Sequence, residues 1–292
     1  MGNAIFIVWR ESIEAMLVIG ILYAWLKRRD AASEGGVLAI GMRYLWGGVG
    51  AGIALALALA GIMLTVQSQL SGEALEYFEI GLVLAAAGLI TQMVLWMRKH
   101  GRTMRRDLES GMEKATEQAN WWGMLAVVAI AVGREGAETV IFLYGLGIEQ
   151  SGMAFAQFIT AVAFGFGLAL LSFWVLTKGS KILSWRGFFR FSEIVLLLLA
   201  GSLLVGGVEK LIGLGLLPAI VEPLWDSSAM LDDTGSVGAV IAAFTGYRAQ
   251  PSLMVALAYT AYWGLVWALM RVQSSPSKPC SIDTAKVAKV GA

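Results

Sequence analysis

Cysteine and histidine are almost absent from this sequence. Its 292 residues contain one of each, Cys280 in a polar C-terminal stretch and His100 in a basic one. One cysteine excludes a disulfide within the chain, and a single histidine excludes a Cys/His metal site. No ligand set for haem or an iron-sulfur cluster is present either, so we expect no permanently bound cofactor. Any metal ion must be held by oxygen.

Charged residues are also few, at 15% of the chain, and they nearly balance, with a net charge of +1. This balance gives no indication of a nucleic-acid partner, and none is expected. Hydrophobic residues make up 58% and the mean hydropathy is +0.71, both above the values of ordinary soluble proteins. The composition therefore predicts an all-α polytopic membrane protein in a lipid bilayer.

Apolar runs long enough to cross a bilayer recur along the chain. We expect the first to be a membrane helix rather than a signal peptide, because it lacks a basic start and Arg10, Glu11 and Glu14 interrupt its apolar core. Together the runs predict about seven transmembrane helices, near residues 4–26, 44–66, 77–97, 121–146, 153–176, 191–212 and 252–270.

The basic residues predict the orientation of these spans. Most lysines and arginines fall within 27–43, 98–114, 178–190 and 271–289, and short loops rich in these residues stay in the cytoplasm. The N-terminus is therefore expected outside and the C-terminus inside.

Two segments between and after the spans have their own character. Residues 98–120 have the charge spacing of a cytoplasmic surface helix. The domain prediction is a permease domain over 1–273 and a flexible cytoplasmic tail over 274–292, with one long external segment near 207–251.

The chain contains an internal repeat. Residues 8–24 resemble 132–147, most clearly in a shared Val-x-Arg-Glu-x-x-Glu start, and Phe78-Glu79-Ile80 parallels Ser192-Glu193-Ile194. Repeat one would cover about 1–97 and repeat two about 121–212. The helix near 252–270 would belong to neither repeat. Because each unit holds three helices, the second copy enters from the opposite side, which gives an inverted repeat of the kind that places transporter sites at the repeat interface.

The repeated motif puts charges deep in the membrane: Arg10, Glu11 and Glu14 in one copy, and Arg134, Glu135 and Glu138 in the other. Each such charge costs roughly 2.5 to 3.5 kcal/mol at the centre of a spanning helix. Within each copy the glutamates are three residues apart, on one helix face, and the arginine can pair with the second glutamate four residues on. Side by side, the two copies would supply four carboxylates for a hard cation such as Fe(III), with Arg10 and Arg134 moderating their charge. The alternative is a pair of structural ion pairs that lock the two helices together.

Other acidic residues are weaker candidates. Glu79, toward the outer end of its helix, and Glu193, toward the inner end of its own, could be stopping points for the ion, or could simply be solvated at the interface. Asp226, Asp232 and Asp233 could capture cations outside, although Asp226 before Ser227 also suits a helix cap. Met93 and Met97 are expected to pack or to face lipid.

The two motifs, Arg10-Glu11-Ser12-Ile13-Glu14 and Arg134-Glu135-Gly136-Ala137-Glu138, resemble the Arg-Glu-Gly-x-Glu signatures of the high-affinity, oxidase-dependent iron permeases of fungi and bacteria. The likeness covers nearly the whole chain and includes the external segments 225–228 and 246–248. Ser12 departs from it, since the family usually has glycine there.

This resemblance implies import of iron, mainly Fe(III), with Glu11, Glu14, Glu135 and Glu138 as ligands or relays. It implies partners outside the membrane, a ferroxidase and an iron-binding delivery protein, and a bacterial chain would lie in the inner membrane.

Three alternatives remain open at this point. The permease could carry Fe(II), Mn(II) or Pb(II), because four carboxylates do not select Fe(III) by themselves. The chain could be a membrane lipid-pyrophosphate phosphatase, but the Pro-Gly-x-Ser-Arg-Ser segment of those enzymes is missing. It could also be a structural membrane protein without transport activity.

Overall fold

A computed structural model of the protein describes residues 2–32, 37–100, 110, 121–146, 153–178 and 185–274. The surface helix expected in 98–120 and the tail expected over 274–292 lie almost entirely outside these residues. The account below concerns the described part of the chain.

All regular structure in the described ranges is α-helical, which confirms the all-α class. Each predicted span falls on one long helix, and a short helix, α8, lies between the last two of these. The helices are α1 (Gly2–Ala32), α2 (Val37–Gln69), α3 (Glu73–His100), α5 (Trp121–Gly145), α6 (Met153–Thr177), α7 (Trp185–Gly213), α8 (Ser236–Thr245) and α9 (Leu253–Ser274).

Five of these helices, α2, α3, α6, α7 and α9, are long and apolar enough to cross a membrane. The protein is therefore a multi-pass membrane protein. Helices α1 and α5 are also long, at 31 and 25 residues, but each carries an arginine and two glutamates in its apolar stretch. The same charges that mark the candidate site thus set these two helices apart from the other five long ones.

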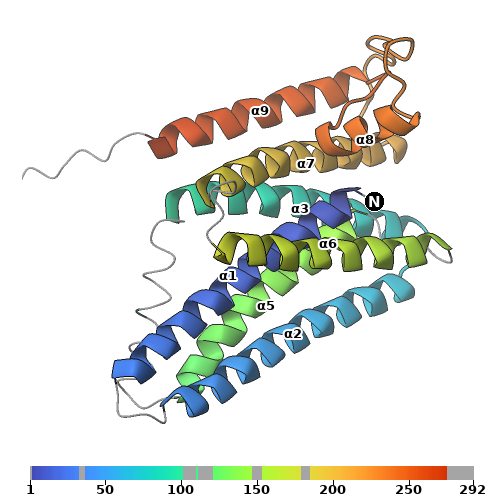
Figure 1. Ribbon diagram of the computed structural model, residues 1–292. Helices are drawn as coiled ribbons and strands as arrows, with labels where there is room; N and C mark the ends of the chain where they lie inside the picture. The colour runs from blue at the N-terminus through green and yellow to red at the C-terminus, as the bar shows by residue number, and fades with distance from the viewer. Residues whose placement is uncertain are drawn as a thin grey trace, which may run out of the picture.

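The helices pack in pairs that come from distant parts of the sequence: α2 lies along α5, α1 along α6, and α3 along α7 (Figure 1). About half of the apolar stretch of α3 and of α7 is buried, against 11% in α2. Helix α3 is therefore internal and faces both α5 and α7, whereas α2 presents most of its apolar surface outward, as lipid requires.

Two of these pairs are brought close by glycine. A Cβ added to Gly52 of α2 would meet the backbone nitrogen of Gly133 at 2.8 Å and the oxygen of Ala129 at 3.0 Å. A Cβ added to Gly165 of α6 would meet the oxygen of Ile5, on α1, at 2.7 Å. Ile5 precedes Arg10 by as many residues as Ala129 precedes Arg134. Both motif helices are therefore held by a glycine contact at the same distance from the motif.

The segment between α7 and α9 is attached to α7 by an ion pair. Arg248 donates two hydrogen bonds to Glu209, from Nε at 2.6 Å and from a terminal nitrogen at 2.7 Å. Hydrogen bonding to this carboxylate raises the pKa of Arg248 above its usual value. The segment folds on itself through Tyr247, whose hydroxyl lies 2.7 Å from that of Ser227 and donates to the oxygen of Leu231 at 3.0 Å.

The glycine contacts predict a selective loss of stability. Substituting Gly52 or Gly165 by alanine inserts a methyl group where no space exists, which typically costs about 1–3 kcal/mol of unfolding free energy. Gly50 and Gly167 face open space on the same helices, so alanine there should be neutral or slightly stabilising through helix propensity. Thermal unfolding of the four purified variants in detergent checks this. Equal midpoints within each matched pair would contradict it.

Candidate metal site

The two motifs meet where α1 passes α5. These helices run in opposite directions, since α2 is antiparallel to α1 and parallel to α5. The two motifs therefore run antiparallel to each other where the helices meet. Arg10, Glu11 and Glu14 are buried on α1, while Glu135 and Glu138 are partly buried on α5.

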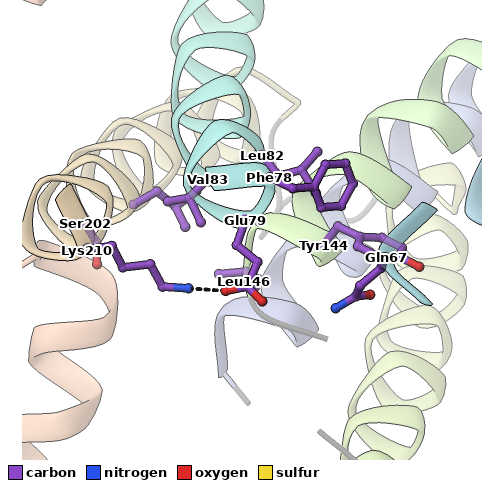
Figure 2. A pocket seen from close by; sticks show the side chains of 12 residues that line it. Gln67, Phe78, Glu79, Leu82, Val83, Tyr144, Leu146, Ser202 and Lys210 are labelled. Carbon is purple, nitrogen blue, oxygen red and sulfur yellow. Dashed lines mark hydrogen bonds and ion pairs between the residues drawn. The ribbon is translucent and has the colours of Figure 1, made fainter. Parts of the chain in front are cut away.

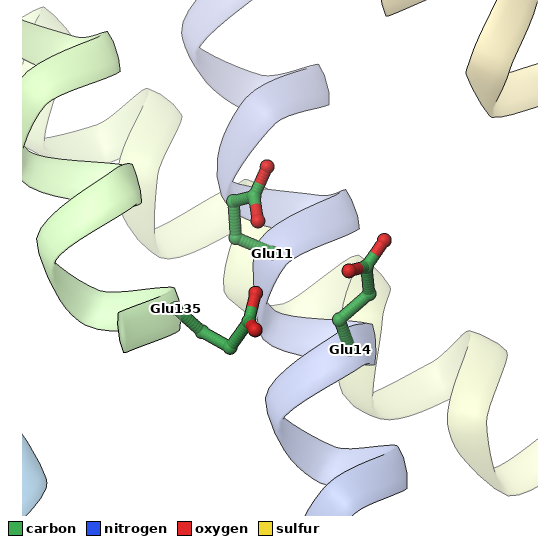
Figure 3. A group of neighbouring side chains, drawn as sticks. All are labelled: Glu11, Glu14 and Glu135. Atoms are coloured by element: carbon green, nitrogen blue, oxygen red, sulfur yellow. The ribbon is translucent and has the colours of Figure 1, made fainter. Parts of the chain in front are cut away.

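Three carboxylates converge at this contact. Glu11, Glu14 and Glu135 each offer an oxygen atom, and these atoms lie within 4.8 Å of one another (Figure 3). They form the only group of at least three acidic, histidine or cysteine side chains with metal-binding spacing in the described part of the chain. Oxygen ligands from two helices at this spacing suit a cation that bridges α1 and α5.

Arg10 neutralises part of this cluster. One terminal nitrogen donates to Glu11 Oε1 at 2.7 Å and the other contacts Glu14. Its side chain is only 2% exposed. Because water does not reach the guanidinium, its charge is compensated almost wholly by the two carboxylates.

The second motif pairs its arginine differently. Arg134 donates from Nε to Glu138 Oε1 at 2.8 Å, and its side chain is 42% exposed. The guanidinium carbon lies 4.7 Å from the centre of the Trp96 ring, a cation–π distance. Glu138 thus stands beside the cluster as the partner of Arg134 and is not among its three converging carboxylates.

Several carboxylate oxygens of the site have no donor. Oε2 of Glu11, of Glu135 and of Glu138 is buried and accepts no hydrogen bond. An ionised carboxylate oxygen away from water is costly unless a cation or a donor compensates it. The donor set and its unpaired oxygens fit a transported cation.

Glu79 and Glu193 lie apart from the cluster, at opposite ends of the antiparallel pair α3 and α7. Lys210 of α7 donates to Glu79 at 2.8 Å, and Arg98 of α3 contacts Glu193. Each glutamate is thus joined to a basic residue on the neighbouring helix. The two ion pairs link α3 to α7 near both of their ends.

Two cavities lie in the bundle, and one of them reaches the cluster. One of about 210 Å³ contains the Glu79–Lys210 pair and is also lined by Gln67 and Tyr144 (Figure 2). The other, about 790 Å³, is an open, mostly apolar groove between α1, α2, α5 and α6. It is lined by Glu11 and Glu135 and extends along α1 toward its C-terminal half, as far as Tyr23.

The three aspartates of the segment between α7 and α9 do not form a metal-binding group. Asp226 accepts hydrogen bonds from the backbone and hydroxyl of Ser228, and Asp232 accepts the same pair from Thr234. These bonds lower the pKa of both aspartates. Asp226 closes a turn rather than capping a helix, so the capping expectation was wrong in its detail. Asp233, the residue after Asp232, is not part of a group with metal-binding spacing either.

Three residues of α3 belong to the site although the sequence did not assign them to it. Met93 and Met97 accept hydrogen bonds from Arg10, at 3.0 and 2.9 Å between nitrogen and sulfur, and Trp96 lies against Arg134. The expectation that these methionines are packing residues is confirmed, since Met93 belongs to a buried hydrophobic cluster and Met97 packs against it; what it missed is their contact with Arg10. Their spacing of four residues was visible in the sequence, but the same spacing is usual for packing residues.

Comparisons with known proteins match iron permeases. The model of the iron permease FTR1 family matches residues 1–276. The ferrous iron permease EfeU of Escherichia coli O157:H7 is 29% identical over 254 residues, which cover 85% of this chain and 87% of the relative. The ferrous iron permease EfeU of Yersinia pestis is 26% identical over 258 residues, covering 88% of each chain. No solved structure matches the chain.

The different surroundings of the two arginines predict unequal effects of their removal. Arg10→Gln leaves two buried carboxylates without their partner, and such a loss costs roughly 3–5 kcal/mol. Arg134→Gln breaks one ion pair whose arginine is partly exposed, against two buried contacts for Arg10, so we expect a clearly smaller loss of stability. Thermal unfolding of the two purified variants compares them. A loss for Arg134→Gln as large as that for Arg10→Gln would contradict this assignment.

Proposed function

This chain belongs to the iron permease FTR1 family, and we propose that it imports iron ions through the cluster of Glu11, Glu14 and Glu135. The observation that carries the proposal is the convergence of these carboxylates from two helices, with unpaired buried oxygens. Such oxygens support a cation site over a purely structural ion-pair network. Glu138 joins the site in this proposal, as a relay that Arg134 holds beside the three ligands.

A charge count supports one oxidation state of the ion over the other. With both arginines and all four motif glutamates ionised, the site carries two negative charges in excess. Fe(II) would neutralise it, whereas Fe(III) would leave a positive charge in a buried place, where net charge is costly. The names of the EfeU relatives point the same way. We therefore propose Fe(II) as the cargo. Fe(III), the expectation from the sequence, is the second candidate, because the cluster supplies only hard oxygen ligands.

The architecture we propose is seven spanning helices, with α1–α3 and α5–α7 as inverted repeats and α9 as the remaining helix. The helix pairing supports it, because exchanging the two units turns the α2–α5 pair into the α1–α6 pair. The equivalent contacts of Gly52 and Gly165 support it too. In this arrangement α1 and α5 cross at the repeat interface, which is where such transporters bind their cargo.

The two cavities suggest a path across the membrane. With the N-terminus outside, the cavity at Glu79 opens outward and the groove below Glu11 and Glu135 leads toward the cytoplasm. We propose Glu79 as an outer stopping point for the ion and Glu193 as an inner one. At each of them the ion would have to displace a basic residue, Lys210 or Arg98.

The surroundings of the permease are proposals of the same kind. We place the chain in the bacterial inner membrane, with iron supplied from outside by a ferroxidase or an iron-binding protein. Asp226, Asp232 and Asp233 could attract cations to this side, at the cost of the turns that the first two now stabilise. The permease itself would perform no reaction, so any oxidation belongs to a partner.

Removing the cluster charges should abolish transport. In the double variant Glu11→Gln with Glu135→Gln, neutral amides replace two of the three converging carboxylates, so we expect iron uptake into proteoliposomes to fall to background. Glu73→Gln, which changes an exposed glutamate at the start of α3, is the matched control and should transport normally. Uptake by a correctly inserted double variant at the control's rate would show that the cluster is not the transport site.

The charge argument predicts a preference for reduced iron. Proteoliposomes should take up radioactive iron faster when ascorbate keeps it as Fe(II) than when it is supplied as ferric citrate, and a ferrous chelator outside should stop the uptake. Faster uptake of ferric iron, unaffected by the ferrous chelator, would instead support Fe(III) as the cargo.

A further inference from the structure

Helix α3 brings two sulfur atoms to the guanidinium of Arg10. Met93 Sδ accepts from one terminal nitrogen at 3.0 Å, and Met97 Sδ accepts from the other at 2.9 Å. The two methionines lie four residues apart and so share one face of the helix. Each terminal nitrogen of Arg10 thus has one carboxylate neighbour on α1 and one thioether neighbour on α3.

The carboxylates that hold Arg10 are also those that a cation needs. Glu11 and Glu14 contact the guanidinium and at the same time belong to the converging cluster. A cation bound to these oxygens would weaken their bonds to Arg10 and would repel it as a like charge. Because the side chain of Arg10 is only 2% exposed, water cannot replace the lost hydrogen bonds.

Thioethers can hold Arg10 when the cation competes with it for the same carboxylates. A methionine sulfur is a neutral, weak hydrogen-bond acceptor, so it can keep a guanidinium in place without supplying a charge that would compete with the cation for the glutamates. The flexible side chain of methionine also tolerates a shift of its partner.

We propose that Met93 and Met97 are positioning residues that hold Arg10 while Glu11 and Glu14 turn from the guanidinium to the transported cation. This inference rests on the proposed function of the cluster. Arg10 then acts as a tethered counter-ion, which neutralises the carboxylates before the cation arrives and remains fixed beside them when it is bound.

The second motif has a different arrangement. Arg134 pairs with Glu138, which stands beside the three converging carboxylates, and rests against the Trp96 ring with 42% of its side chain exposed. A cation in the cluster therefore need not displace Arg134 from its carboxylate. The need for a second acceptor arises at Arg10, where the two methionines lie.

Replacing the sulfurs by carbon tests the proposal. In Met93→Leu with Met97→Leu the guanidinium keeps only its carboxylate partners, so a cation must displace it at greater cost. We expect the KM for ascorbate-reduced iron in proteoliposomes to rise roughly tenfold, as for losses of groups that orient metal ligands, with little change in the maximal rate. Glutamine at both positions restores an acceptor and should return KM toward the wild-type value.

Met124→Leu is the matched control, because Met124 is a buried methionine of α5 that packs in another part of the core. Met97→Leu alone provides a milder variant, since Met97 is only partly buried. An unchanged KM in both methionine variants would overturn the proposal. So would equal losses in the leucine and glutamine variants, since an acceptor for Arg10 would then be irrelevant.

The proposed function can fail separately. If Glu11→Gln with Glu135→Gln still transports iron, the cluster is not the transport site and the role of Arg10 falls with it. If that variant is inactive but the methionine variants behave like Met124→Leu, the cluster stands and only the positioning role of Met93 and Met97 is refuted.

Discussion

The arrangement of this protein depends on mutual neutralisation of charges inside a helix bundle. Each motif places an arginine and two glutamates in the apolar stretch of a helix, and lipid cannot solvate such groups. Bringing the motifs together at the α1–α5 contact lets the charges compensate one another. The compensation is incomplete, because buried oxygens of Glu11, Glu135 and Glu138 lack donors. These unpaired oxygens are the observation on which the proposed cation site rests.

Helix packing serves this contact. Glycines on α2 and α6 allow these helices to lie tightly against α5 and α1, the two motif helices, so both are supported from outside. Helix α3 supplies partners for both arginines. These are the two thioethers that contact Arg10 and the Trp96 ring that contacts Arg134. The two motifs are alike in sequence but not in environment. One arginine is enclosed and the other is partly open, so the two halves of the site would respond differently to an arriving ion.

Much of this could be predicted from the sequence, because it depends on local patterns. Apolar runs marked the helices, and two Arg-Glu-x-x-Glu motifs marked the charged contact. What escaped prediction depends on which helices become neighbours. The pairing of Glu79 with Lys210 joins residues 131 positions apart, and nothing near either residue indicates it. Met93 and Met97 look like packing residues until Arg10 is placed beside them. The turns closed by Asp226 and Asp232 depend on the Ser228 and Thr234 side chains, and the sequence suggested cation capture or a cap instead.

The most direct test of the account is the position of iron itself. Crystals of the protein grown with ascorbate-reduced iron, measured by anomalous diffraction at the iron absorption edge, would locate the ion without assumptions about transport. The account predicts an anomalous peak between the carboxylates of Glu11, Glu14 and Glu135, with Arg10 still in contact with Met93 and Met97. Iron found only beside Glu79, or only at the external aspartates, would contradict it.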